Sequence, residues 1–223
     1  MTLAEVVKNS PISEEVDSIG GHFVFADVTW EFYKQMCDQL ERSGQHARVT
    51  FDEGRMEIMT TTGWHEGIKT CVARLLEHYS FVRDIPIQGF GNVSCEREDW
   101  LKGLQPDECY YITNKILLDD SGHLDLLHGP PPDLVIEVEV TRPSIPKHPI
   151  YVKMGVPELW AYTSEKITVL KLEDKKYIPV SISSYFPDLD LAEFFRFVQI
   201  ARLDQHEGVK AFDAWLRATG VKK

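Results

Sequence analysis

Two carboxylates alternate with apolar side chains in the segment 133–141, which reads DLVIEVEVT. Because side chains alternate between the two faces of a β-strand, Glu137 and Glu139 share one face and lie roughly 7 Å apart. Neighbouring carboxylates repel each other, and burial in a sheet adds a desolvation cost. A hard divalent cation with oxygen ligands relieves both. The segment therefore predicts a metal site, with solvated glutamates on an exposed edge strand as the alternative interpretation.

Two further side chains could complete such a site. Asp107 follows Pro106 and precedes a short apolar strand, so its carboxylate could reach a cleft at the end of a sheet. Lys147 follows Glu137 by ten residues, and an ammonium group beside a metal can hold a phosphate or orient an attacking water. The plainer interpretations are a turn aspartate and a solvated surface lysine.

The elements that must position these residues are helices and strands in mixed order. Apolar residues recur at helical spacing in 28–43 and 64–83. Strands are expected at 48–51, 55–60, 85–95, 107–112, 133–141, 158–163, 167–172 and 177–181, with a hairpin turn at 52–54. A short helix at 150–154 and two amphipathic helices within 187–219 complete the chain. This order predicts the α/β class, with a mixed β-sheet flanked by helices.

Length and composition favour one soluble domain. The chain has 223 residues, of which 43% are hydrophobic and 26% charged, and it contains no repeat or low-complexity linker. We therefore expect a single domain over 1–223, with an irregular lead-in at 1–20. No run of about 18 apolar residues predicts a membrane span, and the start lacks the features of a secretory signal. The four cysteines are scattered, as expected for free thiols in a reducing cytosol. The missing span, the missing signal and the scattered cysteines together predict a cytoplasmic protein.

The charge balance bears on the choice of partner. The formal net charge is −11, whereas a typical nucleic-acid binder carries a basic footprint. An enzyme whose acidic groups are neutralised by bound Mg²⁺ is still compatible with this charge. The sequence contains no phosphate-binding GxxxxGK[ST] loop, no HExxH metal motif and no GxSxG nucleophile motif.

Together, the acidic segments resemble the PD-(D/E)XK nuclease superfamily, and more closely a bacterial branch of restriction-endonuclease-like proteins once classed as a domain of unknown function. The resemblance extends from about Phe51 to Leu172. It rests on the hairpin segment FDEGRMEIM and on His65 at the start of the next helix. It also rests on a first acidic motif, Pro106-Asp107, a second acidic motif, PDLVIEV, and the segment from Tyr151 through GVPELW.

The resemblance implies a restriction-endonuclease-like core and a Mg²⁺-dependent endonuclease that hydrolyses phosphodiester bonds of DNA, with Mn²⁺ as a possible substitute. Asp107 and Glu137 would bind the metal, and Lys147 would be the catalytic lysine. The superfamily motif usually places a lysine two residues after the second acid, where this chain has Glu139. That residue either binds metal as a third carboxylate or supports Lys147.

Two weaker candidates and two other functions stay open. Glu57 and His65 could have an outer-shell or second-metal role, although a histidine at a helix start is often a packing or capping residue. The chain could also be a non-catalytic metal-binding or protein-interaction module on a nuclease scaffold, or a metal-dependent hydrolase of a small phosphorylated substrate. The expected partner is DNA, cut with weak sequence specificity, and no membrane partner is expected. Because restriction-like nucleases often dimerise to cut both strands, a homodimer is a reasonable hypothesis.

Overall fold

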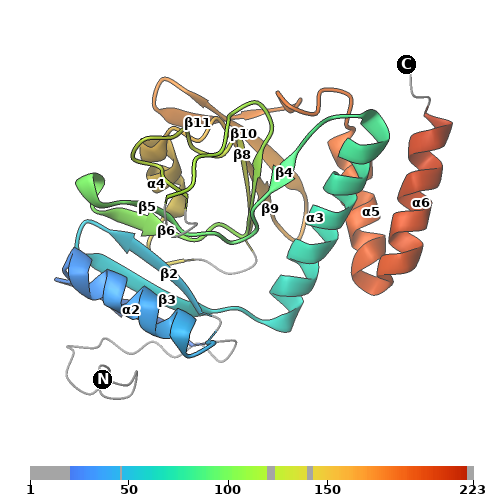
Figure 1. The fold of residues 1–223 in the computed structure, drawn as a ribbon. Coiled ribbons are helices and arrows are strands. Elements are labelled where there is room, and N and C mark those ends of the chain that lie inside the picture. The colour runs from blue at the N-terminus through green and yellow to red at the C-terminus, as the bar shows by residue number, and fades with distance from the viewer. Residues whose placement is uncertain (1–20, 46, 120–123, 140–142, 220–223) are drawn as a thin grey trace. The chain divides into compact units, whose positions relative to one another are not determined.

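The computed structural model describes residues 21–45, 47–119, 124–139 and 143–219 (Figure 1). The chain forms two compact units, each built from three separate segments. The first unit comprises 1–62, 94–105 and 143–150, and the second comprises 63–93, 106–142 and 151–223. Because the chain passes repeatedly from one unit to the other, the division does not test the expectation of one domain over 1–223, which stays a prediction. The predicted lead-in at 1–20 lies outside the described residues.

The first unit is an antiparallel sheet packed with one helix. Helix α2 (Trp30–Arg42) begins after Thr29, whose side chain accepts a hydrogen bond from the Phe32 amide at 3.2 Å. A short 3-10 helix η1 (Glu98–Trp100) joins the last two strands. The strands pair in the order β1-β3-β2-β6-β5. Their bounds are β1 (His22–Phe25), β2 (Ala47–Asp52), β3 (Arg55–Thr60), β5 (Cys95–Arg97) and β6 (Lys102–Leu104).

The hairpin predicted around residues 52–54 is confirmed. Asp52 pairs with Arg55, which leaves Glu53 and Gly54 as a two-residue turn. Both turn residues have positive φ, at 48° and 91°, as the turns that match the twist of a hairpin require. Strands β1 and β6, of four and three residues, are too short to produce a recognisable sequence pattern and are not predicted from the sequence.

The second unit is a six-stranded mixed sheet, in the order β11-β10-β9-β8-β7-β4. β8 and β9 run parallel, and the chain between them includes helix α4 (Lys147–Met154). The other described pairs of this sheet are antiparallel. The bounds are β4 (Gln88–Gly89), β7 (Glu108–Tyr111), β8 (Leu134–Val138), β9 (Glu158–Tyr162), β10 (Ile167–Glu173) and β11 (Lys176–Val180).

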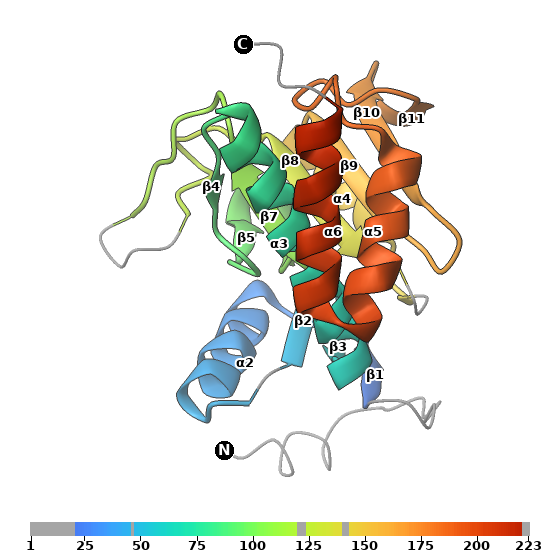
Figure 2. The ribbon, with the colours of Figure 1, turned by 90° about the vertical axis from the view of Figure 1, so that its right-hand side faces the viewer.

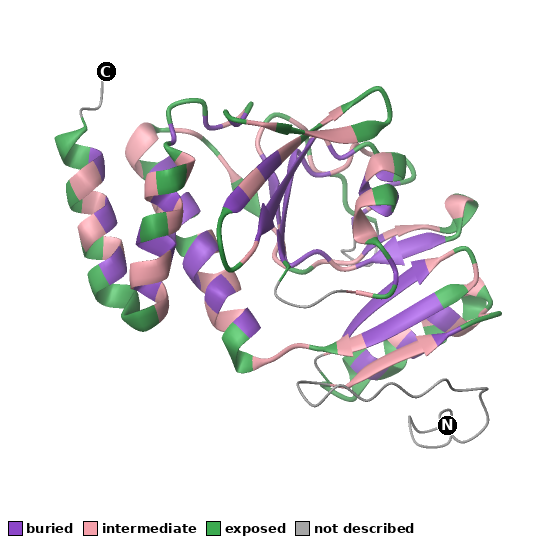
Figure 3. Ribbon diagram, turned by 180° about the vertical axis from the view of Figure 1, so that it is seen from behind, coloured by how far each residue is buried: buried purple, intermediate pink, exposed green. Residues whose placement is uncertain are grey.

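Three helices, α3 (Gly63–Arg83), α5 (Leu191–Leu203) and α6 (Gln205–Ala218), lie side by side over one face of this sheet (Figure 2). Leu134, Ile136 and Val138 of β8 pack in one apolar core with residues of these helices, as the alternating pattern predicts. Val135 and Glu137 point to the opposite face and are also buried. Strands at the centre of the sheet are correspondingly drawn as buried in Figure 3. β8 is therefore an interior strand, and the interpretation of an exposed edge strand is wrong.

The predicted fold class, a mixed sheet flanked by helices, is confirmed. Helices α5 and α6 account for the predicted segment 187–219. The single long strand expected at 85–95 is not observed as such. Within this range only Gln88 and Gly89 form strand pairs with β7, and Gly91 interrupts the extended backbone with a left-handed φ of 59°. Among the described residues, no helix has both the length and the apolar character needed to cross a membrane.

A close approach of α5 and α6 gives a test of this packing. A Cβ at Gly208 would lie only 2.5 Å from the Cα of Ala201 on α5. We therefore expect Gly208→Ala to lower the free energy of unfolding by about 2–3 kcal/mol. The matched control is Gly67→Ala in α3, where a Cβ meets no atom within 4 Å and should stabilise the helix by about 0.5–1 kcal/mol. Urea unfolding that shows equal effects for both variants would contradict the packing.

Candidate active site

The register of two neighbouring strands sets Asp107 opposite Glu137. In the antiparallel β7–β8 pair, Glu108 aligns with Ile136 and Cys109 with Val135. One residue before β7, the same register aligns Asp107 with Glu137, and directly opposite residues have Cβ atoms about 5 Å apart. Asp107 is 1% exposed and Glu137 is 4% exposed. The structure thus brings together the two carboxylates that the sequence predicts as metal ligands.

Neighbouring groups fix the orientation of both carboxylates. The Val138 amide donates a hydrogen bond of 2.6 Å to Asp107 Oδ2. The same oxygen lies 3.1 Å from Nε2 of His65, which is the third residue of α3. The Tyr151 hydroxyl, on α4, donates a hydrogen bond to Glu137 Oε1. The pair is therefore held by three different elements of the second unit.

This arrangement fits a hard divalent cation. Two buried carboxylates in facing positions repel each other, and a bound cation offsets that repulsion and their loss of hydration. Mg²⁺ is usually held by one or two carboxylates, with waters and substrate phosphates completing its shell. In the described part of the chain, no group of three or more His, Cys, Asp or Glu residues is arranged to hold a metal. A cation on Asp107 and Glu137 would therefore take its remaining ligands from backbone, water or substrate oxygens.

A comparison with family models shows to which family the chain belongs. The chain matches the family model Uma2, described as "Putative restriction endonuclease", over residues 30–202. The chain belongs to the Uma2 family. A solved structure from Anabaena variabilis ATCC 29413, described as "a putative nuclease belonging to DUF820", is similar at 16% identity, with 67% of this chain and 90% of that chain covered and a TM-score of 0.48. The search of curated proteins gives no significant match. Family membership supports a nuclease acting on nucleic acid.

In this Uma2-family chain, Glu139 occupies a different environment from the two buried acids. Its side chain is exposed at the end of β8, and its amide donates a hydrogen bond of 2.7 Å to the carbonyl of Tyr162. It does not form a three-residue ligand group with Asp107 and Glu137. A role for Glu139 in metal binding or in support of Lys147 stays a prediction.

Two other residues predicted from the sequence, Glu57 and Lys147, belong to the first unit. Glu57 on β3 is 1% exposed and accepts a hydrogen bond from His22 Nε2 at 2.5 Å. It also accepts from the amides of Ser144 at 2.6 Å and Ile145 at 3.2 Å. These bonds fix the segment that leads into α4, whose first residue is Lys147. An outer-shell or second-metal role for Glu57, and the catalytic role of Lys147, stay predictions.

Asp133 accepts hydrogen bonds from several groups, a role that its sequence context alone does not predict. Its Oδ2 accepts hydrogen bonds from the amides of Ile112 at 2.7 Å, Asn114 at 2.8 Å and Thr113 at 2.9 Å. Its Oδ1 accepts from the hydroxyls of Thr113 at 2.7 Å and Tyr185 at 3.2 Å. Burial raises the pKa of Asp133, but the hydrogen bonds outweigh it and leave this pKa below its ordinary value.

The contacts of Asp133 have a consequence for the site. They tie the segment that follows β7 to the residue directly before β8, and so fix the register between these strands. That register is what sets Asp107 opposite Glu137. The sequence offers one signal for this role, because Asp133 directly precedes a strand and follows three prolines. Tyr151, by contrast, is recognisable only through the family resemblance.

Proposed function

We propose that this protein is a Mg²⁺-dependent endonuclease that hydrolyses phosphodiester bonds of DNA. The observation that carries the proposal is the facing of two buried carboxylates, Asp107 and Glu137, on adjacent strands. When bound there, Mg²⁺ would neutralise the negative charge on a phosphate oxygen and would lower the pKa of a bound water, which makes that water a better nucleophile. Membership of the Uma2 family supports the choice of a phosphodiester over other substrates.

The side chains of the site have distinct proposed roles. Asp107 and Glu137 hold the cation, and His65 and Tyr151 hold these two carboxylates in orientation through the contacts described above. The ammonium group of Lys147 stabilises the negative charge that develops on the phosphate as the water attacks. In α4, Lys147 lies one helical turn before Tyr151.

The net charge of −11 favours a second candidate, a non-catalytic metal-binding or protein-interaction module on the same scaffold. An acidic chain repels the phosphate backbone unless cations are bound. The two candidates share the metal site and differ in hydrolysis. A cleavage assay therefore separates them.

The assay uses end-labelled single- and double-stranded DNA with Mg²⁺, Mn²⁺ or EDTA. We expect wild type to cleave with either metal and not with EDTA, and Asp107→Ala and Lys147→Ala to be inactive. The control variant Glu165→Gln changes an exposed acid in the turn between β9 and β10 and should cleave like wild type. Absence of cleavage by folded wild type with both metals would favour the non-catalytic candidate. Discrete bands from one recognition sequence would contradict the expected weak specificity.

The cytoplasmic location and the homodimer stay predictions. Cutting both strands of a duplex is easier for a protein with two copies of one site. Size-exclusion chromatography with light scattering should therefore give the mass of a dimer. A monomer mass at every concentration would contradict the homodimer.

A further inference from the structure

A large aromatic side chain is exposed at the start of α3, next in sequence to a residue that contacts the candidate site. Trp64 is the second residue of α3 and is 61% exposed. The next residue along the helix is His65, whose Nε2 contacts Asp107 Oδ2 at 3.1 Å. Burying a tryptophan gains free energy for folding, so the exposure of Trp64 is not explained by the packing of the second unit.

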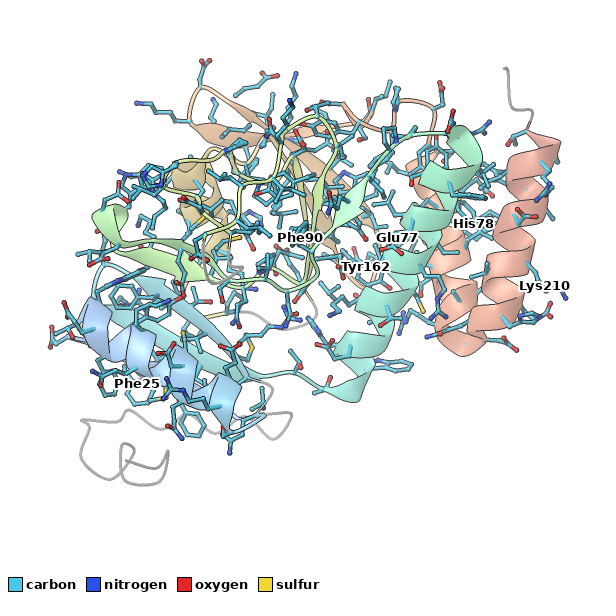
Figure 4. The ribbon with its side chains drawn as sticks, in the orientation of Figure 1. Phe25, Glu77, His78, Phe90, Tyr162 and Lys210 are labelled. Atoms are coloured by element: carbon cyan, nitrogen blue, oxygen red, sulfur yellow. The ribbon has the colours of Figure 1, made fainter. Side chains whose placement is uncertain are left out.

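An arginine from another helix is held over the Trp64 ring. The guanidinium carbon of Arg202, on α5, lies 4.8 Å from the ring centroid. The Arg202 Nη1 donates to Gln199 Oε1 at 2.7 Å and to the hydroxyl of Tyr162 at 3.3 Å. Gln199 donates to the same hydroxyl at 2.8 Å; Figure 4 labels Tyr162 in the second unit. The guanidinium is thus fixed over the ring rather than left mobile.

A second arginine extends the positive charge along the same helices. Arg74 of α3 is exposed and donates a hydrogen bond to Gln205, the first residue of α6. Burial raises the pKa of Cys71, and both Arg74 and Arg202 are close enough to oppose that shift. Two guanidinium groups therefore converge on this part of an otherwise acidic protein.

Acidic groups near these arginines have cationic or backbone partners. Glu66 pairs with Lys69 at 3.2 Å, and Glu207 pairs with Lys210 at 2.9 Å. Asp204 caps α6, with its Oδ1 accepting from the Glu207 amide at 3.0 Å. The groups named here comprise four cations, Arg74, Arg202, Lys69 and Lys210, and three carboxylates. Cations therefore outnumber carboxylates among them, and cations are the groups that contact a phosphate backbone.

From these contacts we propose that Trp64 and Arg202 form a stacking subsite for an unpaired nucleobase of the DNA strand that is cut. The inference rests on the proposed nuclease function and names the form of DNA that the site prefers. An aromatic ring offers a face to any base, and an adjacent guanidinium adds cation–π attraction. Because Trp64 adjoins His65, the stacked base belongs to a nucleotide close to the scissile phosphate. Single-stranded or frayed DNA presents such a base, whereas a fully paired duplex does not.

Anisotropy of a fluorescein-labelled oligodeoxythymidylate, with Ca²⁺ in place of Mg²⁺ and at low salt, tests the subsite apart from Mg²⁺-dependent cleavage, because Ca²⁺ also takes carboxylate oxygens as ligands. We expect Trp64→Ala to weaken binding of this single strand by roughly 5- to 150-fold, the range for loss of one stacked base. Trp64→Phe keeps an aromatic face and should retain most of the affinity. A blunt-ended, fully paired two-strand duplex should bind wild type and Trp64→Ala equally.

The matched control is Phe81→Ala, because Phe81 is 83% exposed on the same helix and about 25 Å further along it. This variant should bind the single strand like wild type. Equal affinity of Trp64→Ala and wild type for the single strand would overturn the subsite. So would equal losses on the single strand and the duplex, or no binding of the single strand by wild type. Wild type that cleaves DNA while Trp64→Ala binds normally would overturn the subsite and keep the nuclease. Selective loss of single-strand binding in a protein that never cleaves would keep the subsite and overturn the nuclease.

Discussion

Replacing Glu137 with glutamine is expected to reduce metal-dependent DNA cleavage by about 10³-fold or more, while the chain stays folded. Glutamine keeps the size of the side chain and an oxygen that can accept from Tyr151, but it removes the charge that would hold the cation. The substitution also removes the repulsion between Glu137 and Asp107, so the free energy of unfolding without metal should stay the same or rise. Cleavage rates under single-turnover conditions, with urea unfolding of the same samples, measure both effects.

Glu158 provides a matched control for this substitution. It is fully buried on β9, the strand next to β8. Its carboxylate accepts from the Trp160 ring nitrogen at 2.7 Å, the Ser183 hydroxyl at 2.6 Å and the Ser184 amide at 2.7 Å. Glu158→Gln should therefore lower stability but leave cleavage by the folded protein intact. Wild-type cleavage by Glu137→Gln, or an equal loss in Glu158→Gln at a temperature where it is folded, would contradict the assigned metal-binding role.

Replacing Asp133 with alanine is expected to lower the free energy of unfolding by about 3–5 kcal/mol. The change leaves the amides of Ile112, Thr113 and Asn114 without their common acceptor. Because these bonds fix the β7–β8 register, cleavage should fall as well, even in conditions where the variant is folded. Chemical denaturation at neutral pH measures the loss, and an unfolding free energy within 1 kcal/mol of wild type would contradict the role of Asp133.

The stabilisation by Asp133 should depend on pH. Its pKa in the folded protein lies below the ordinary value of 3.8, so the folded state binds fewer protons than the unfolded state as the pH falls through this range. The contribution is therefore fully present above pH 3.8 and is lost as the pH falls through the lower pKa of the folded protein. Asp133→Asn cannot titrate, so the stability difference between it and wild type should shrink on acidification. A constant difference from neutral pH down to the acid limit of folding would contradict this.

The sequence predicts the parts of the fold that depend on local patterns. The 52–54 turn, the amphipathic helices and the alternating face of β8 follow from spacing alone. Glu137 could be named because acids inside an apolar strand need an explanation, whereas Asp107 was named from its place before a strand and from the family resemblance. Their facing arrangement could not be predicted, since the β7–β8 register depends on contacts between Asp133 and the segment 112–114. The partners of Trp64 were equally out of reach, because Arg202 is 138 residues away along the chain.

Calorimetric titration with Mn²⁺ tests most directly whether Asp107 and Glu137 form a metal site. Mn²⁺ takes the same kinds of oxygen ligand as Mg²⁺. We predict a saturable heat of binding for wild type and for Glu158→Gln, and no saturable heat for Asp107→Asn or Glu137→Gln at the same concentrations. Binding that persists unchanged in both Asp107→Asn and Glu137→Gln would contradict the account, because the cation would then be held elsewhere.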